Sequence, residues 1–239
     1  MKTLRQLNQD WILATEIHKL EARLWRLAQK RGVKIVVISS AMRGDGKSTT
    51  LANLVTALAL HPDRKILAVD LDFREPKMNS HFDLNVSTPL GSVLRGEAEF
   101  GQALIKCTLP NLDLLMPHPE GEDPAILLET LRLPELAEFA RANYDLTLID
   151  VPALVPVADA SAVLPYTDGV VLMAMAGKTT KAHLTRAREI CLGMDAEILG
   201  LIVGNVQEGL TGYQQDAYYF SYRKPSSRDE LDANSPPAD

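Results

Sequence analysis

The sequence is poor in cysteine and has no apolar run long enough to cross a membrane. Its 239 residues include two cysteines, Cys107 and Cys191, and neither has another cysteine or a histidine at ligand spacing. We therefore expect no disulfide framework and no cysteine-based metal site, in a reducing cytosol. The longest stretch without Asp, Glu, Lys or Arg is Ser48–Pro62, whose fifteen residues fall short of the roughly 20 that a membrane-spanning helix needs. A cytoplasmic protein without a transmembrane segment of its own is expected.

A net positive charge is also missing, since the formal net charge is −6. Residues 1–32 hold seven Lys and Arg against three Asp and Glu, a balance of +4, which leaves −10 for residues 33–239. An acidic body argues against general affinity for nucleic acid. The basic N-terminal segment could contact a membrane surface, a partner or the acidic body of a neighbouring copy, or form a solvated helix face.

Hydrophobic residues make up 46% of the chain, and their spacing predicts the fold. Apolar residues three and four apart over 4–28 predict one amphipathic helix that Gly32 ends. From residue 33, short continuous apolar runs alternate with helical patterns, which is typical of parallel strands buried on both faces. The expected fold is α/β, a doubly wound, mostly parallel sheet with helices on both faces. Strands are expected over 33–39, 66–70, 112–116, 146–150, 169–175 and 198–203, and further helices over 48–60, 124–142 and 180–193.

The stretch VVISSAMRGDGKSTTLANLVTALAL is an apolar strand, a glycine-containing loop and a long amphipathic helix. Gly44 and Gly46 let successive backbone N–H groups face one point, where the start of the helix adds its dipole, so the loop is expected to bind phosphate. The strict phosphate-loop pattern has glycine where this chain has Ala41. We predict that ATP contacts this segment through Gly44, Asp45, Gly46, Lys47, Ser48 and Thr49.

Three carboxylates end two other predicted strands. Asp70 and Asp72 follow the apolar run at 66–70, and Asp150 ends the run at 146–150. Because the carboxyl ends of parallel strands meet at one edge of a sheet, these acids are expected beside the phosphate loop. A carboxylate there can hold Mg²⁺ or orient a nucleophile.

Three segments of the sequence resemble the Walker motifs of the bacterial tyrosine kinases of capsule and exopolysaccharide assembly (BY-kinases). The segment SSAMRGDGKSTT resembles their Walker A motif, LAVDLDFREP their second Walker motif and LTLIDVP their Walker B motif. The resemblance runs from about Ile35 to about Val206. It implies an Mg·ATP-dependent kinase, related to MinD and ParA in fold, that phosphorylates tyrosines in its own C-terminal tail between neighbouring subunits of a homo-oligomer.

The resemblance also implies roles for single residues. Ser48, Asp70 and Asp150 would hold Mg²⁺, and Lys47 would bind the phosphates. Asp72 would take the proton of the tyrosine hydroxyl, whose pKa of about 10 keeps it protonated at neutral pH. Arg74 would steady either the loop or the transition-state charge. Asn205 stands where related ATPases contact adenine. The implied phosphate acceptors are Tyr213, Tyr218, Tyr219 and Tyr222.

At the level of the whole chain, three parts are expected: an N-terminal amphipathic helix (1–32), a P-loop kinase domain (33–206) and a flexible, tyrosine-containing tail (207–239). The resemblance implies an activating partner, the cytoplasmic segment of a membrane polysaccharide co-polymerase. That partner would recruit the chain to the inner face of the cell membrane.

Departures from the family pattern keep two alternatives open. Val151 and Ala153 replace the threonine and second proline after the Walker B aspartate, Met175 stands where arginine is common, and Arg43 replaces a usual proline. A non-catalytic ATP-dependent switch or scaffold of the same fold would accommodate them. A MinD/ParA-type positioning ATPase would be expected to carry an extra loop lysine, where this chain has Met42.

Overall fold

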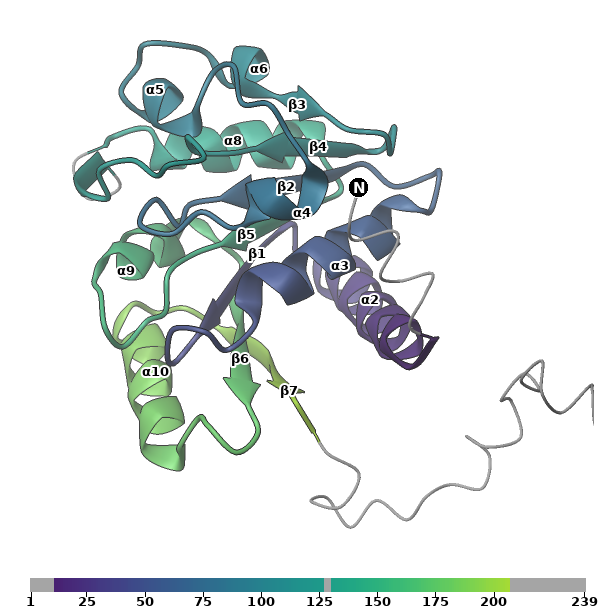
Figure 1. Cartoon of the computed structure of the whole chain (residues 1–239), viewed down its shortest axis with the longest axis vertical. Coiled ribbons are helices and arrows are strands. Elements are labelled where there is room, and N and C mark those ends of the chain that lie inside the picture. The colour runs from purple at the N-terminus through teal and green to yellow at the C-terminus, as the bar shows by residue number, and fades with distance from the viewer. Residues whose placement is uncertain (1–10, 127–129, 207–239) are drawn as a thin grey trace, which may run out of the picture. The chain divides into compact units, whose positions relative to one another are not determined.

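The computed structural model describes residues 11–126 and 130–206, and its centre is a seven-stranded sheet with helices on both faces (Figure 1). The strand order is β3-β4-β2-β5-β1-β6-β7, and every pair is parallel except β3 with β4. The predicted fold class is therefore confirmed. The strands are β1 (Ile35–Ser40), β2 (Ile66–Asp70), β3 (Ile105–Lys106), β4 (Leu112–Leu115), β5 (Leu146–Asp150), β6 (Gly169–Met175) and β7 (Ile198–Gly204).

The helices divide between the two faces of the sheet. One face packs against α2, α3 and α4, and the other against α5, α6, α8, α9 and α10. Their bounds are α2 (Trp11–Arg31), α3 (Lys47–Ala59), α4 (Met78–Phe82), α5 (Leu90–Leu94), α6 (Phe100–Ala103), α8 (Leu133–Asn143), α9 (Asp159–Val163), the 3-10 turn η1 (Leu164–Tyr166) and α10 (Lys181–Gly193). In the described part of the chain, no helix combines the length and apolar character that crossing a bilayer requires.

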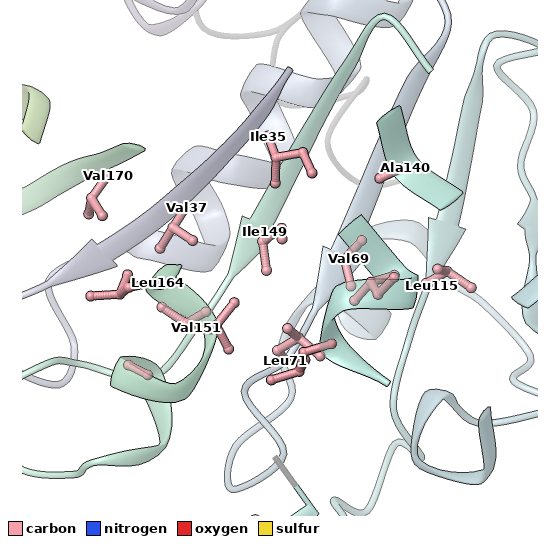
Figure 2. Close-up of a cluster of buried hydrophobic side chains, with 14 of the residues drawn as sticks. Ile35, Val37, Val69, Leu71, Leu115, Ala140, Ile149, Val151, Leu164 and Val170 are labelled. Atoms are coloured by element: carbon pink, nitrogen blue, oxygen red, sulfur yellow. The ribbon is translucent and has the colours of Figure 1, made fainter. Parts of the chain in front are cut away.

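Alternate residues of the central strands fill the two layers of the core. Ile35 and Val37 of β1 face the α8 side, while Val36 and Ile38 face the α3 side, and all four are 0–1% exposed. Figure 2 shows the first of these layers, where side chains of β1, β5 and β2 lie side by side. Burying an aliphatic side chain of this size contributes roughly 1.5–3 kcal/mol. The continuous apolar runs of the sequence are thus explained by burial on both faces.

The predicted helix over 4–28 is described from Trp11 onward, and its earlier part lies outside the described residues. It continues to Arg31 and ends at Gly32, whose φ of +68° is the left-handed conformation that commonly terminates helices. Ile17, Leu24 and Ala28 are buried, and α2 packs against α3.

The predicted helix over 124–142 is wrong as a single element. Residues Thr130–Arg132 are not helical, and α8 begins at Leu133. Pro134 explains the break because proline lacks an N–H and is tolerated only in the first turn of a helix. The sequence pattern also missed β3, whose two residues are too few to show a period.

Candidate nucleotide-binding site

The loop between β1 and α3 has the backbone that phosphate binding requires. Gly44 and Gly46 have φ of +80° and +85°, and Gly46 is the N-cap of α3. A side chain at Gly44 would also place its Cβ 2.9 Å from Nζ of Lys178. The first N–H groups of a helix have no intrahelical acceptor, so the start of α3 can bind anionic oxygens.

Lys47 and Ser48 follow at the start of α3 and are both only 7% exposed. Nζ of Lys47 lies 4.0 Å from Oδ2 of Asp72, which is itself 8% exposed. A buried ammonium is stable only near negative charge, so this Lys47 position suits a phosphate group beside Asp72.

Asp70 and Asp150 lie side by side because they are register partners on β2 and β5. Both are fully buried. Oδ1 of Asp70 accepts the backbone N–H of Asp72 at 2.9 Å, and Oδ2 accepts that of Met78 at 3.3 Å. Burial, and then repulsion by Asp150, raise the pKa of Asp70 well above its usual value.

Neither oxygen of the Asp150 carboxylate forms a hydrogen bond within 3.5 Å with a described residue, although the Ser48 hydroxyl is near enough to lower the pKa of Asp150. Burial raises its pKa, and the nearby Lys47 opposes that rise. A buried acceptor without a partner is costly, so this oxygen pair fits a cation or its bound water.

Mg²⁺ is usually held by one or two carboxylates together with the phosphates of its nucleotide. The described residues contain no group of three or more His, Cys, Asp or Glu arranged to hold a metal. Ser48, Asp70 and Asp150 supply the oxygen donors that Mg²⁺ prefers, so the residues present fit this cofactor.

Asp72 is the remaining carboxylate of the candidate site, and a backbone N–H holds it in place. Its Oδ1 accepts the backbone N–H of Glu75 at 3.2 Å. Burial raises the pKa of Asp72, and the charge of Lys47 opposes the rise. The Asp72 carboxylate is therefore positioned beside Lys47 by a backbone N–H of its own loop.

The Arg74 guanidinium is paired with the carboxylate of Asp159 and is therefore not a free donor to the candidate site. Its Nε and Nη2 donate to the Asp159 carboxylate at 2.5 and 3.2 Å, and Asp159 is 2% exposed at the start of α9. The hydrogen bond with Asp159 raises the pKa of Arg74. Arg74 thus ties the loop after β2 to the segment after β5, a contact that the spacing of residues in the sequence does not reveal.

The side chains of Asp45, Thr49 and Asn205, which are predicted to contact the nucleotide, lie near other parts of the protein. The Asp45 side chain turns toward the loop after β6, where Oδ2 accepts the Thr179 hydroxyl at 3.0 Å, so its backbone remains for phosphate. Oγ1 of Thr49 lies 3.4 Å from Nε2 of His81 in α4. Asn205, with φ of +54°, donates from Nδ2 to the carbonyl of Ala176 at 3.4 Å, at the end of β7.

The segment after β5 is bound directly to the phosphate loop. The N–H groups of Leu154 and Val155 donate to the carbonyls of Ser40 and Ala41 at 2.9 and 3.4 Å.

The described structure brings Lys47, Ser48, Asp70, Asp72 and Asp150 together at one edge of the sheet. The four tyrosines at 213, 218, 219 and 222 lie outside the described residues.

Comparison with known proteins identifies the family. No protein-family model matches the sequence. The chain is 35% identical over 189 residues to tyrosine-protein kinase YwqD of Bacillus subtilis (strain 168), which covers 79% of this chain and 78% of that protein. The chain belongs to the bacterial tyrosine-protein kinase family. The family resemblance and enzyme class inferred from the Walker motifs are thus confirmed.

Solved structures show the same fold. The kinase domain of Escherichia coli tyrosine kinase ETK superposes with a TM-score of 0.72 at 22% identity, covering 80% of this chain and 76% of that one, which shows the shared fold. The septum site-determining protein MinD of Pyrococcus horikoshii OT3, solved with Mg-ADP, gives a TM-score of 0.62 at 26% identity, covering 71% and 69%. The kinases and MinD therefore share a P-loop architecture with this chain.

Proposed function

We propose that this chain is an Mg·ATP-dependent protein-tyrosine kinase that phosphorylates tyrosines in its own C-terminal segment. The observation that carries the proposal is the convergence of Lys47 with the buried carboxylates of Asp70, Asp72 and Asp150. Membership of the tyrosine kinase family supports the choice of acceptor.

The phosphate loop and Lys47 bind and orient the phosphates of ATP, through backbone N–H groups at the start of α3 and the buried ammonium. Ser48, Asp70 and Asp150 would hold Mg²⁺. When bound, this ion neutralises charge on the phosphates. Thr49 and Asn205 are proposed to contact the α-phosphate and the adenine.

Asp72 is the proposed proton acceptor for the tyrosine hydroxyl. As the phenol Oη bonds to the γ-phosphorus, the bond from that phosphorus to the bridging oxygen breaks, and ADP leaves with the electron pair. The phenol proton passes to Asp72, whose pKa is raised by burial and therefore lies closer to that of its donor. Arg74 is proposed to steady the loop that carries Asp72, through its bonds to Asp159.

The proposed acceptors are Tyr213, Tyr218, Tyr219 and Tyr222, in a tail (207–239) that follows the helix (1–32) and kinase domain (33–206). Each phosphate adds about 1.5 to 2 negative charges at neutral pH. Successive additions would drive the subunits of a homo-oligomer apart and make phosphorylation an assembly switch.

We further propose that the cytoplasmic segment of a membrane polysaccharide co-polymerase activates the kinase at the inner face of the cell membrane. The process served would be capsule or exopolysaccharide synthesis or export. Support comes from the Walker motifs that resemble BY-kinases and from the family relationship.

The test is incubation of the purified chain with Mg·ATP, followed by phosphotyrosine mapping by mass spectrometry. Lys47→Ala and a chain truncated after Gly209 run beside it, each with and without the partner's cytoplasmic segment. The expected result is phosphate on Tyr213–Tyr222 that is absent in Lys47→Ala. A chain that binds ATP but stays unmodified with a verified partner would instead be an ATP-dependent switch.

A further inference from the structure

An ion network joins the phosphate loop to the loop between β2 and α4. Nε of Arg43, in the phosphate loop, donates to Oε2 of Glu75 at 2.6 Å. Nζ of Lys77 lies 3.0 Å from the other oxygen, Oε1. The Arg43 and Lys77 contacts lower the pKa of Glu75 to about 2, so Glu75 stays ionised at any physiological pH.

Glu75 also holds the Asp72 carboxylate. Its backbone N–H donates to Oδ1 of Asp72 and to the Asp72 carbonyl, both at 3.2 Å. The side chain of Glu75 is therefore fastened to the phosphate loop while its backbone fastens Asp72. This connection runs from Arg43 to Asp72 through protein atoms alone and does not need the nucleotide.

Fold stability does not explain the Arg43–Glu75 pair. The Arg43 side chain is 75% exposed and that of Glu75 is 34% exposed. Ion pairs at such exposure contribute little to stability because water screens them. The segment between β2 and α4 is neither strand nor α-helix, so the position of Asp72 depends on local contacts of this kind.

The backbone of Arg43 is held separately from its side chain. Nζ of Lys178 donates to the Arg43 carbonyl at 2.8 Å and lies 3.4 Å from Oδ1 of Asp45. Truncating the Arg43 side chain therefore leaves the phosphate-binding backbone of the loop anchored from the β6 side. Loss of the side chain would act on Asp72 and not on nucleotide binding.

We infer that Arg43 is a positioning residue, which through Glu75 fixes the Asp72 carboxylate beside Lys47 for transfer to the acceptor hydroxyl. The inference rests on the proposed kinase function. It assigns a purpose to the arginine at position 43, which otherwise stands out as a departure from the family pattern.

The test compares Arg43→Ala, Glu75→Gln and the charge swap Arg43→Glu with Glu75→Arg. Arg186→Ala is the matched control, because Arg186 forms a similarly exposed ion pair with Glu189 on α10. Arg43→Ala is expected to leave the Kd for Mg·ADP within about twofold and to lower the tyrosine phosphorylation rate about tenfold or more, as misplaced catalytic groups do. The charge swap should recover part of that rate.

A second readout does not depend on activity. Hydrogen exchange of the Glu75 amide, which donates to Asp72, should accelerate about tenfold in Arg43→Ala and stay unchanged in Arg186→Ala. An unchanged amide, or an active Arg43→Ala enzyme at the wild-type rate, overturns the inference. A wild-type chain that phosphorylates no tyrosine overturns the proposed function instead, and the amide still decides whether Arg43 holds the Asp72 loop.

Discussion

Asp150 carries a carboxylate into a fully buried position, where neither oxygen forms a hydrogen bond within 3.5 Å with a described residue. Burial raises its pKa, so the folded chain keeps this proton to higher pH than the unfolded chain, whose Asp pKa is about 3.9. The free energy of unfolding contributed by this group therefore falls as pH rises from about 4 through the raised pKa, and then levels off.

We predict that Asp150→Asn stabilises the nucleotide-free protein by about 1–3 kcal/mol at pH 8, and that the gain shrinks toward pH 4. The substitution removes the charge whose burial is costly while keeping the shape of the side chain. Urea denaturation of both proteins at the two pH values measures the difference. Equal stability at pH 8 would show that the carboxylate is already compensated without metal or nucleotide.

The positions of the acidic residues could be predicted from the sequence because Asp70 and Asp150 each end an apolar strand and Asp72 follows Asp70 by two residues. The partners of the charged residues around them could not. Arg43 meets Glu75 across 32 positions, and Arg74 meets Asp159 across 85. Such pairs depend on how the loops pack, and nothing in local spacing encodes them.

Among the structural elements, the strands were predictable and one helix was not. Burial on both faces gives each central strand a continuous apolar run, which marks its bounds to within two residues. A helical period tolerates an interruption, so residues 124–142 resembled one helix although Pro134 restarts it. Short helices such as α4 and α9 hold five residues each, too few to display a helical face.

Two glycines near helix ends provide a matched pair of substitutions. Gly32 has φ of +68°, whereas Gly193 is the last helical residue of α10, and a Cβ added at either glycine would meet no atom within 4 Å. We predict that Gly32→Ala costs about 1 kcal/mol because of backbone strain alone, while Gly193→Ala gains up to about 1 kcal/mol. Thermal denaturation compares the two. Equal effects would mean that the conformation at Gly32 does not limit stability.

At the scale of the whole molecule, the described residues proposed to bind nucleotide all lie in the unit that ends at Asn205. We predict that a chain ending at residue 206 and the full chain show the same stabilisation by Mg·ADP, about 2.7 kcal/mol at 100 times the Kd. Differential scanning calorimetry with and without ligand measures it, with Lys47→Ala as the control that should lose the shift. A smaller shift in the short chain would indicate that residues 207–239 contribute to binding.

The strand order has a consequence for synthesis on the ribosome. β5 lies between β2 and β1, although both precede it in the chain by more than 70 residues. A nascent chain that has left the ribosome only as far as the Gly44–Gly46 loop and Asp70–Asp72 still lacks β5, the strand that brings these two segments together. The two segments are therefore expected to come together only after β5 has left the ribosome exit tunnel.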